Sequence, residues 1–192
     1  MIAFPKPYAD AVARLRVPSG FLLVLVFAWF SRPTTESLLR GLPVALAGLA
    51  LRGWAAGCLA KNQRLASGGP YAHTRNPLYI GTLLVAAGLA VAARSGWLAL
   101  LFGAVFLLVY LPVIQLEEQH LREIFPEYEE YAKVVPALWP RIGPAISGRD
   151  PQSGSPVPPT PFQWVLYRKN QEYQATIGLA AGLVFLLWKA LR

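Results

Sequence analysis

Polar and cationic side chains gather in one short stretch of an otherwise apolar chain, between Gly69 and Gly81. Pro77 lies within it where a helix can begin, because proline at the first helical position gives up no hydrogen bond. Backbone amides at a helix N-terminus carry partial positive charge, and Arg75 adds a full one. The stretch therefore favours an anionic group such as a carboxylate or a phosphate.

Two long apolar segments follow, at 77–93 and 97–125. Only residues 94–96 separate them, and so short a connection allows little more than a tight turn between antiparallel helices. The spacing therefore predicts a helical hairpin in the membrane, with a kink in its second helix at Pro112.

A second polar cluster ends that hairpin, where Glu117, Glu118 and His120 follow the apolar part of the second helix. Because a hairpin returns to the side on which it starts, these side chains are expected beside Arg75. We therefore expect both polar clusters to line one water-accessible pocket.

The composition limits the class of protein. Of 192 residues, 55% are hydrophobic, and several apolar runs approach the roughly 20 residues that a bilayer core requires. The net charge is +8, but Lys and Arg flank the apolar runs instead of forming one face, so they indicate membrane topology and not nucleic-acid binding. Cys58 stands alone, and His73 and His120 lie too far apart for a metal-ligand spacing, so no metal site is predicted.

These features predict an all-α fold: a polytopic membrane helical bundle with about five transmembrane helices and a short interfacial helix on the cytoplasmic side. The predicted organisation is a membrane core at 1–142 with helices at about 17–31, 41–60, 77–93 and 97–125, a Pro-rich linker at 143–161, and a C-terminal helix at 162–192 expected to span the membrane. The interfacial helix is expected at 127–135.

Positive charge divides unevenly between the two sides of this bundle. The N-terminus, the 61–76 loop and the 117–174 segment share one side and carry most of the Lys and Arg residues. The positive-inside rule places that side, and with it the polar pocket, in the cytoplasm. The expected location is therefore the inner membrane of the cell.

One charge and two glycine pairs lie within the apolar segments. Arg52 interrupts the second of them and must face the protein interior or water, either in the site or in a structural pair. Gly53 with Gly57 and Gly178 with Gly182 allow close helix contact, and a homodimer through such faces is compatible with the sequence.

Three motifs, in order, resemble those of one family. They are Gly69-Pro-Tyr-x-x-x-Arg-Asn-Pro-x-Tyr-x-Gly81, Glu117-Glu-x-x-Leu-x-x-x-Phe125 and Tyr128-x-x-Tyr-x-x-x-Val-Pro-x-x-x-Pro140. Over this region the chain resembles the membrane methyltransferases related to isoprenylcysteine carboxyl methyltransferase and phosphatidylethanolamine N-methyltransferase. The pattern departs from that family at Asn76, where histidine is common, at Pro126, where glycine is usual, and at Ala137, where a basic residue often stands.

The resemblance implies S-adenosylmethionine as the methyl donor and an acceptor that arrives from the lipid. It implies that the residues binding the cofactor are Tyr71, His73, Arg75, Asn76, Pro77, Tyr79, Gly81, Glu117 and Glu118. The residues expected to act in the transfer itself are Arg75, Glu118 and His120.

The nature of the acceptor stays open at this point. A prenylcysteine carboxylate is already a nucleophile, whereas a phospholipid ammonium must first lose a proton, to Glu118, His120 or a tyrosine. Arg75 fits a clamp for the carboxylate of the acceptor, for that of the cofactor or for a lipid phosphate.

Two other classes remain as alternatives. One is a membrane reductase of the sterol reductase type, which would use a nicotinamide cofactor. The other is a small channel, carrier or assembly subunit in which the acidic pair and Arg52 line a pathway. A soluble Rossmann-type methyltransferase is excluded because no Gly-x-Gly-x-x-Gly follows a strand pattern.

Overall fold

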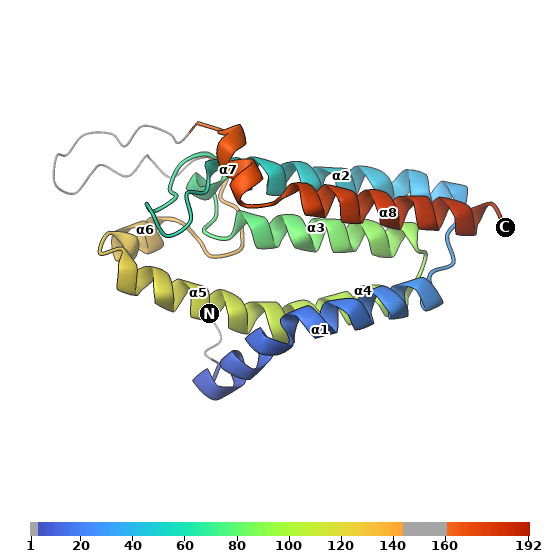
Figure 1. Ribbon diagram of the computed structural model, residues 1–192, viewed down its shortest axis with the longest axis horizontal. Coiled ribbons are helices and arrows are strands. Elements are labelled where there is room, and N and C mark those ends of the chain that lie inside the picture. Colours follow the sequence, from blue (N-terminus) through green and yellow to red (C-terminus); the bar gives the residue numbers. More distant parts are fainter. Residues whose placement is uncertain (1–3, 144–160) are drawn as a thin grey trace. The chain divides into compact units, whose positions relative to one another are not determined.

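The computed structural model describes residues 4–143 and 161–192, and every regular element in these ranges is a helix (Figure 1). In chain order the elements are α1 (Lys6–Phe30), α2 (Thr35–Cys58), the 3-10 helix η1 (Gly69–Ala72), α3 (Pro77–Ala92), α4 (Gly96–Val105), the π-helical segment η2 (Phe106–Tyr110), α5 (Leu111–Ile124), α6 (Tyr128–Val134), α7 (Trp164–Lys169) and α8 (Tyr173–Ala190). The predicted all-α fold is confirmed. The linker predicted at 143–161 lies, apart from its two end residues, outside the described residues.

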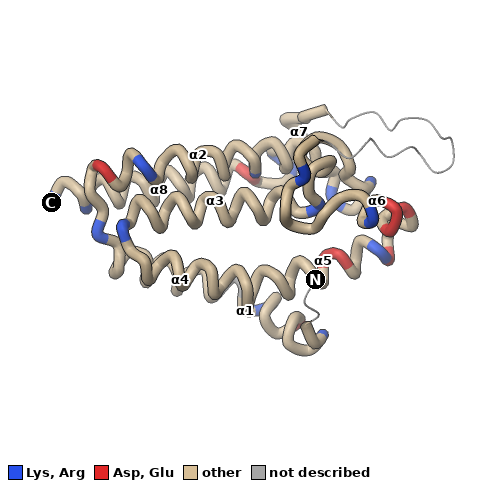
Figure 2. Tube along the Cα trace, turned by 180° about the vertical axis from the view of Figure 1, so that it is seen from behind, with Lys and Arg blue, Asp and Glu red and all other residues tan. Residues whose placement is uncertain are grey.

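Within residues 4–143 and 161–192, three helical runs are long and apolar enough to cross a membrane: α2, the run Gly96–Ile124 and α8. The two parts of α1, bent by 60°, make a fourth if they count as one span. The apolar α3 has 16 residues, a length of about 24 Å against a hydrocarbon core of about 30 Å. Neither α3 nor α4 carries a charged residue along its length (Figure 2). The polytopic membrane class is confirmed, and the number five for the spans stays a prediction.

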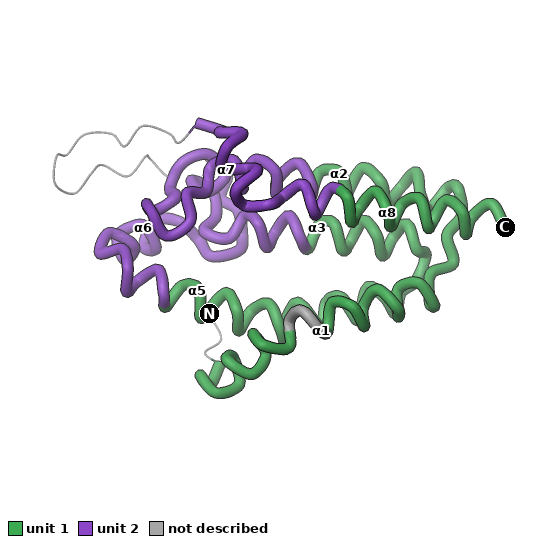
Figure 3. Tube along the Cα trace, viewed as in Figure 1, with its two compact units in different colours: residues 1–48, 83–119, 177–192 green, residues 49–82, 120–176 purple. Residues whose placement is uncertain are grey.

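The chain divides into two compact units (Figure 3). Unit 1 comprises residues 1–48, 83–119 and 177–192, and unit 2 comprises residues 49–82 and 120–176. Four of the helices, α2, α3, α5 and α8, cross from one unit into the other. The division into core, linker and C-terminal helix stays a prediction.

A close contact between α2 and α3 organises unit 1. A methyl group added at Gly41 would lie 2.3 Å from the carbonyl oxygen of Gly88, so only glycine fits there. Ser37 reinforces the contact by donating a hydrogen bond of 2.8 Å to the carbonyl of Ala92. Both glycines have a small residue four positions later, Ala45 and Ala92, which is the spacing that favours close helix packing.

The first helix of unit 1 begins at Lys6, well before the residue 17 expected from the apolar run, because polar residues outside the lipid also form helix. Its start is held against α5, where the side-chain amide of Gln115 accepts from the backbone N–H of Phe4 and donates to its carbonyl. At its other end, Lys189 of α8 donates to the carbonyl of Ala28 at 2.8 Å.

The irregularity expected at Pro112 takes the form of a π-helical segment, η2, directly before it. Proline has no N–H, so the carbonyl of Leu108, four residues earlier, loses its helical donor. The hydroxyl of Tyr8 donates to that carbonyl at 2.7 Å. A side chain from α1 thus replaces the hydrogen bond that the proline removes, as a lipid-embedded helix requires.

Unit 2 packs around the end of α2. Ala55, Cys58, Ala66 and Tyr71 form its buried cluster, in which the loop after α2 folds back onto the helix. The C-terminal segment, where the sequence predicted one helix at 162–192, forms the two helices α7 and α8. Helix α7 and the start of α8 belong to unit 2, and the rest of α8, from residue 177, belongs to unit 1.

Candidate active site

The Arg75-bearing stretch begins with a tight turn in unit 2. Gly69 has a φ of 58°, a left-handed conformation that favours glycine, and a side chain there would also approach Cys58 Sγ at 3.1 Å. The turn leads into η1, which buries Tyr71. Two residues after Arg75, α3 begins at Pro77, as the sequence predicts.

The first turn of α3 contains the remaining predicted residues of this stretch. The carbonyl of Asn76 accepts from the N–H groups of Tyr79 and Ile80, so Asn76 is the residue at which the helix starts. Tyr79 is buried, and so are Pro77 and Gly81. This end of the stretch is therefore packed in the interior of unit 2.

The segment that follows α6 is hydrogen-bonded along the other side of this stretch. The N–H of Arg75 donates to the carbonyl of Pro136 at 2.9 Å. The hydroxyl of Thr74 and the side-chain amide of Asn76 both donate to the carbonyl of Ala137, at 2.9 Å and 3.1 Å. The first and third motifs of the sequence thus form one hydrogen-bonded body.

Two further contacts complete this body. The hydroxyl of Tyr131 in α6 donates to the carbonyl of Tyr71 at 2.7 Å. His73 pairs with Arg141 through its carbonyl and through its ring Nδ1, which lies 3.1 Å from the Arg141 carbonyl and must carry a proton to donate to it. The backbone carbonyl of Arg141 therefore fixes the orientation of the His73 ring.

Two arginines meet on one buried ring. The guanidinium carbon of Arg75 lies 6.0 Å from the centre of the Tyr128 ring, and that of Arg122, from the end of α5, lies 5.5 Å from it. Tyr128 is only 1% exposed. Arg122 also forms an ion pair with Glu129. Cations bind to aromatic faces in this way, and the arrangement concentrates positive charge next to the start of α3.

The α5 helix carries the second predicted cluster. Glu118 is buried, whereas Glu117 and His120 are exposed on the helix surface. Glu117 and Glu118 belong to unit 1 and His120 to unit 2, because the boundary between the units falls within this helix. Four residues after Glu118, on the same face of α5, comes Arg122.

Three residues of this arrangement were not among the predicted site residues: Arg122, Tyr128 and Tyr131. The two tyrosines belong to the third motif, and in the structure they contact the Arg75-bearing stretch directly. Their spacing of three placed them on one face of a short helix, but nothing in the sequence indicated which element that face would meet. Arg122 was counted only as a topology charge.

Arg52, for which site and structural pair were both open, lies in a structural pair. Its guanidinium forms an ion pair with Glu172, described further below.

Lys133 and Glu130 form another ion pair, on α6. Lys133 donates a hydrogen bond to Glu130, and this contact raises the pKa of Lys133. Because both side chains are exposed, the pair adds little stability.

Fold and site together define a polytopic α-helical membrane protein with a cationic, hydrogen-bonded cluster where its helices α3 and α5 meet the loops of unit 2. The chain matches the family model described as phospholipid methyltransferase over residues 45–128. No solved structure matches it.

Three curated proteins are similar to this chain. The cobalt-zinc-cadmium resistance protein CzcN of Cupriavidus metallidurans is 39% identical over 43% of this chain and 38% of its own length. The nickel-cobalt-cadmium resistance protein NccN of Alcaligenes xylosoxydans xylosoxydans is 31% identical over 73% of this chain and 72% of its own. The protein-S-isoprenylcysteine O-methyltransferase of Schizosaccharomyces pombe is 30% identical over 71% of this chain and 60% of its own. The chain therefore belongs to the phospholipid methyltransferase family of membrane proteins.

Proposed function

We propose that this protein transfers a methyl group from S-adenosylmethionine to a lipid-embedded acceptor, a phospholipid amine or a prenylcysteine-type carboxylate, at the cytoplasmic face of the inner membrane. The observation that carries the proposal is the body formed by the first and third motifs, in which Arg75 and Arg122 share the ring of Tyr128. The family match and the relative named as a methyltransferase support it.

The chemistry of the donor set fits the cofactor. S-adenosylmethionine supplies a methyl group already activated by its sulfonium, and it also carries a carboxylate, an ammonium and an adenine. The guanidinium groups at Tyr128 suit the carboxylate, because arginine pairs with carboxylates through two parallel hydrogen bonds. The buried carboxylate of Glu118 suits the ammonium, and Tyr71, Tyr79 and the oriented ring of His73 suit the adenine.

The reaction requires little covalent chemistry from the protein. Methyl transfer is an in-line displacement, so the enzyme aligns donor and acceptor and keeps water out. A hydrogen-bonded backbone around Arg75 serves the alignment, since Pro136 and Ala137 fix the stretch that carries it. An amine acceptor must also lose a proton, and we assign that step to Glu118 or His120.

The proposal is tested by following tritium from labelled S-adenosylmethionine in the purified, full-length protein. Acceptors are offered in two sets, a membrane phospholipid extract and a series of prenylcysteine analogues. Transfer into one set names the acceptor class, and transfer should fall at least tenfold in Arg75→Met, which loses the clamp. Absence of transfer into both sets, from protein that remains folded in detergent, would contradict the proposal.

A further inference from the structure

The C-terminal segment breaks between α7 and α8, over the three residues Asn170, Gln171 and Glu172. Gln171 has a φ of 56°, which interrupts the helix by a left-handed residue. At this break the side chains of Asn170 and Glu172 bond to other residues of unit 2. Asn170 bonds to the end of α2, and Glu172 bonds to a side chain of the same helix.

Asn170 binds the end of α2. Its side-chain amide donates to the carbonyls of Ala56 and Leu59, at 2.9 Å each. Carbonyls at a helix C-terminus lack a partner within the helix, so this amide satisfies groups that would otherwise be exposed to an apolar surrounding. The N–H of Gln163, before α7, donates to the carbonyl of Gly57 in the same turn.

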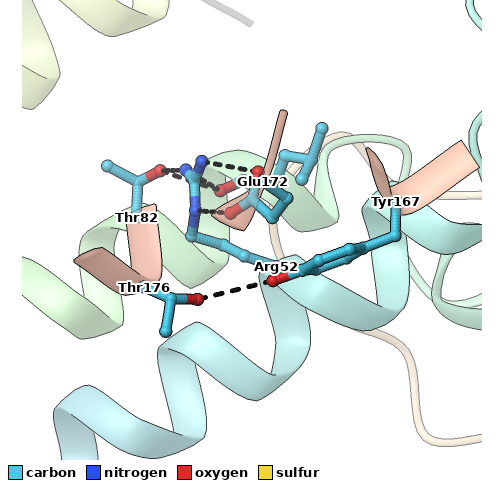
Figure 4. A network of polar contacts seen from close by, with 6 residues as sticks. Arg52, Thr82, Tyr167, Glu172 and Thr176 are labelled. Carbon is cyan, nitrogen blue, oxygen red and sulfur yellow. Dashed lines mark hydrogen bonds and ion pairs between the residues drawn. The ribbon is translucent and has the colours of Figure 1, made fainter. Parts of the chain in front are cut away.

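Glu172 binds Arg52 of α2 with both carboxylate oxygens, as Figure 4 shows. The Nε atom of Arg52 lies 2.5 Å from one oxygen and the terminal nitrogen Nη2 lies 3.0 Å from the other. Glu172 is 7% exposed and Arg52 is 23% exposed at the side chain. Such a bidentate pair fixes the plane of the guanidinium.

The remaining nitrogen of Arg52, Nη1, reaches α3. It donates to the hydroxyl of Thr82 (Figure 4). It also donates, at 3.4 Å, to the carbonyl of Leu78. Thr82 donates in turn to the same carbonyl at 2.9 Å. Leu78 lies in the first turn of α3, directly after Pro77, so this contact holds the helix start on which Arg75 depends.

We propose that Arg52 and Glu172 are positioning residues for the candidate active site. Glu172 orients the guanidinium of Arg52, and Arg52 fixes the first turn of α3 and thereby the stretch from Tyr71 to Tyr79. The C-terminal segment is then part of the site's support and not an appendage. The inference rests on the proposed function where it concerns the cofactor, but the support of α3 can be measured without any ligand.

Two variants test the two ends of this relay in the full-length protein. Glu172→Gln removes the carboxylate charge that orients Arg52. Thr82→Val removes one of the two acceptors that Arg52 has on α3, together with the hydrogen bond that Thr82 donates to Leu78, and leaves the ion pair in place. The matched control is Glu36→Gln, because Glu36 and Arg40 also form an ion pair on α2, with both side chains exposed.

The first readout is deuterium exchange of the backbone amides of residues 76–84, without ligand. Both variants should exchange faster than wild type at this helix start, while Glu36→Gln should match wild type. The second is calorimetric titration with S-adenosylhomocysteine, whose dissociation constant should rise about tenfold in Glu172→Gln, as for a displaced binding group. Thr82→Val should weaken binding without changing the thermal midpoint by more than the control does.

The outcomes separate the inference from the proposed function. Exchange and affinity like wild type in folded Thr82→Val would overturn the inference, and this variant decides alone if Glu172→Gln does not fold. Lower thermal stability with unchanged exchange at residues 76–84 would also overturn it, since the pair would then serve stability only. If wild type binds no S-adenosylhomocysteine, the proposed function fails, and the exchange measurement still decides whether Arg52 holds α3.

Discussion

Arg75 and Arg122 come from different motifs and approach the same tyrosine ring, at 6.0 Å and 5.5 Å from its centre. Arg122 also pairs with Glu129 next to that ring. Because arginine binds carboxylates through two parallel hydrogen bonds, these two side chains are the ones to which, at the scale of single residues, we assign the carboxylate of the cofactor.

The acidic residues of α5 differ in burial. Glu118 is 7% exposed, whereas Glu123, on the same helix, faces solvent. Glu118→Gln should weaken S-adenosylhomocysteine binding about tenfold or more, because a charged hydrogen-bond partner is worth roughly 1.5–3 kcal/mol. Glu123→Gln should bind like wild type in the same calorimetric series, and equal affinity in both variants would remove Glu118 from the site.

Single residues also show how far the sequence can be interpreted. Pro77 as a helix start follows from its fixed φ and missing N–H, which are properties of the residue itself. The positions of Tyr128 and Tyr131 cannot be predicted from the residues themselves. A tyrosine at a membrane surface and a tyrosine covered by a loop can have the same neighbours in the sequence. Whether Arg52 belongs to the site or to a structural pair becomes evident only from its contact with Glu172, 120 positions away.

At the scale of elements, the run from α4 to α5 depends on a side chain from α1. Tyr8 supplies to the Leu108 carbonyl the hydrogen bond that Pro112 cannot. The effect of a proline on its own helix can be predicted from the sequence. The donor that compensates for it cannot, because it comes from α1, 100 residues earlier in the chain. The same holds for the break before α8, where Gln171 takes a left-handed φ.

A double-mutant cycle tests this compensation. Tyr8→Phe alone should lower stability by about 1 kcal/mol, the usual net value of one hydrogen bond. In a Pro112→Ala background the alanine N–H can reach Leu108, so the same substitution should cost much less. Thermal unfolding in one detergent measures all four proteins, and additive effects of the two substitutions would contradict the account of η2.

At the scale of the whole molecule, the hydrophobic runs and the distribution of Lys and Arg predicted the membrane class and proposed an orientation, since both depend on composition along the chain. They did not predict the two compact units, which cut across four helices. Such a division depends on side-chain contacts between segments far apart in the sequence. Gly41 and Gly88 illustrate this, because their contact becomes evident only when α2 and α3 are side by side.

The orientation is tested at the two ends of α2. In a Cys58→Ala background, a single cysteine replaces either Thr35 or Gln63, both exposed. A membrane-impermeant maleimide applied to intact cells should label the cysteine at 35, and label the one at 63 only after the membrane is opened. The reverse pattern would place the candidate site outside the cytoplasm.

The central claim is that the cationic cluster of unit 2 belongs to a site for S-adenosylmethionine. Calorimetric titration of the detergent-solubilised, full-length protein with S-adenosylhomocysteine, in parallel with NADPH, measures it most directly. The account predicts one S-adenosylhomocysteine per chain and no heat of binding from NADPH. Binding of NADPH alone would make the protein a reductase, and binding of neither ligand by folded protein would leave the cluster without the cofactor that we assign to it.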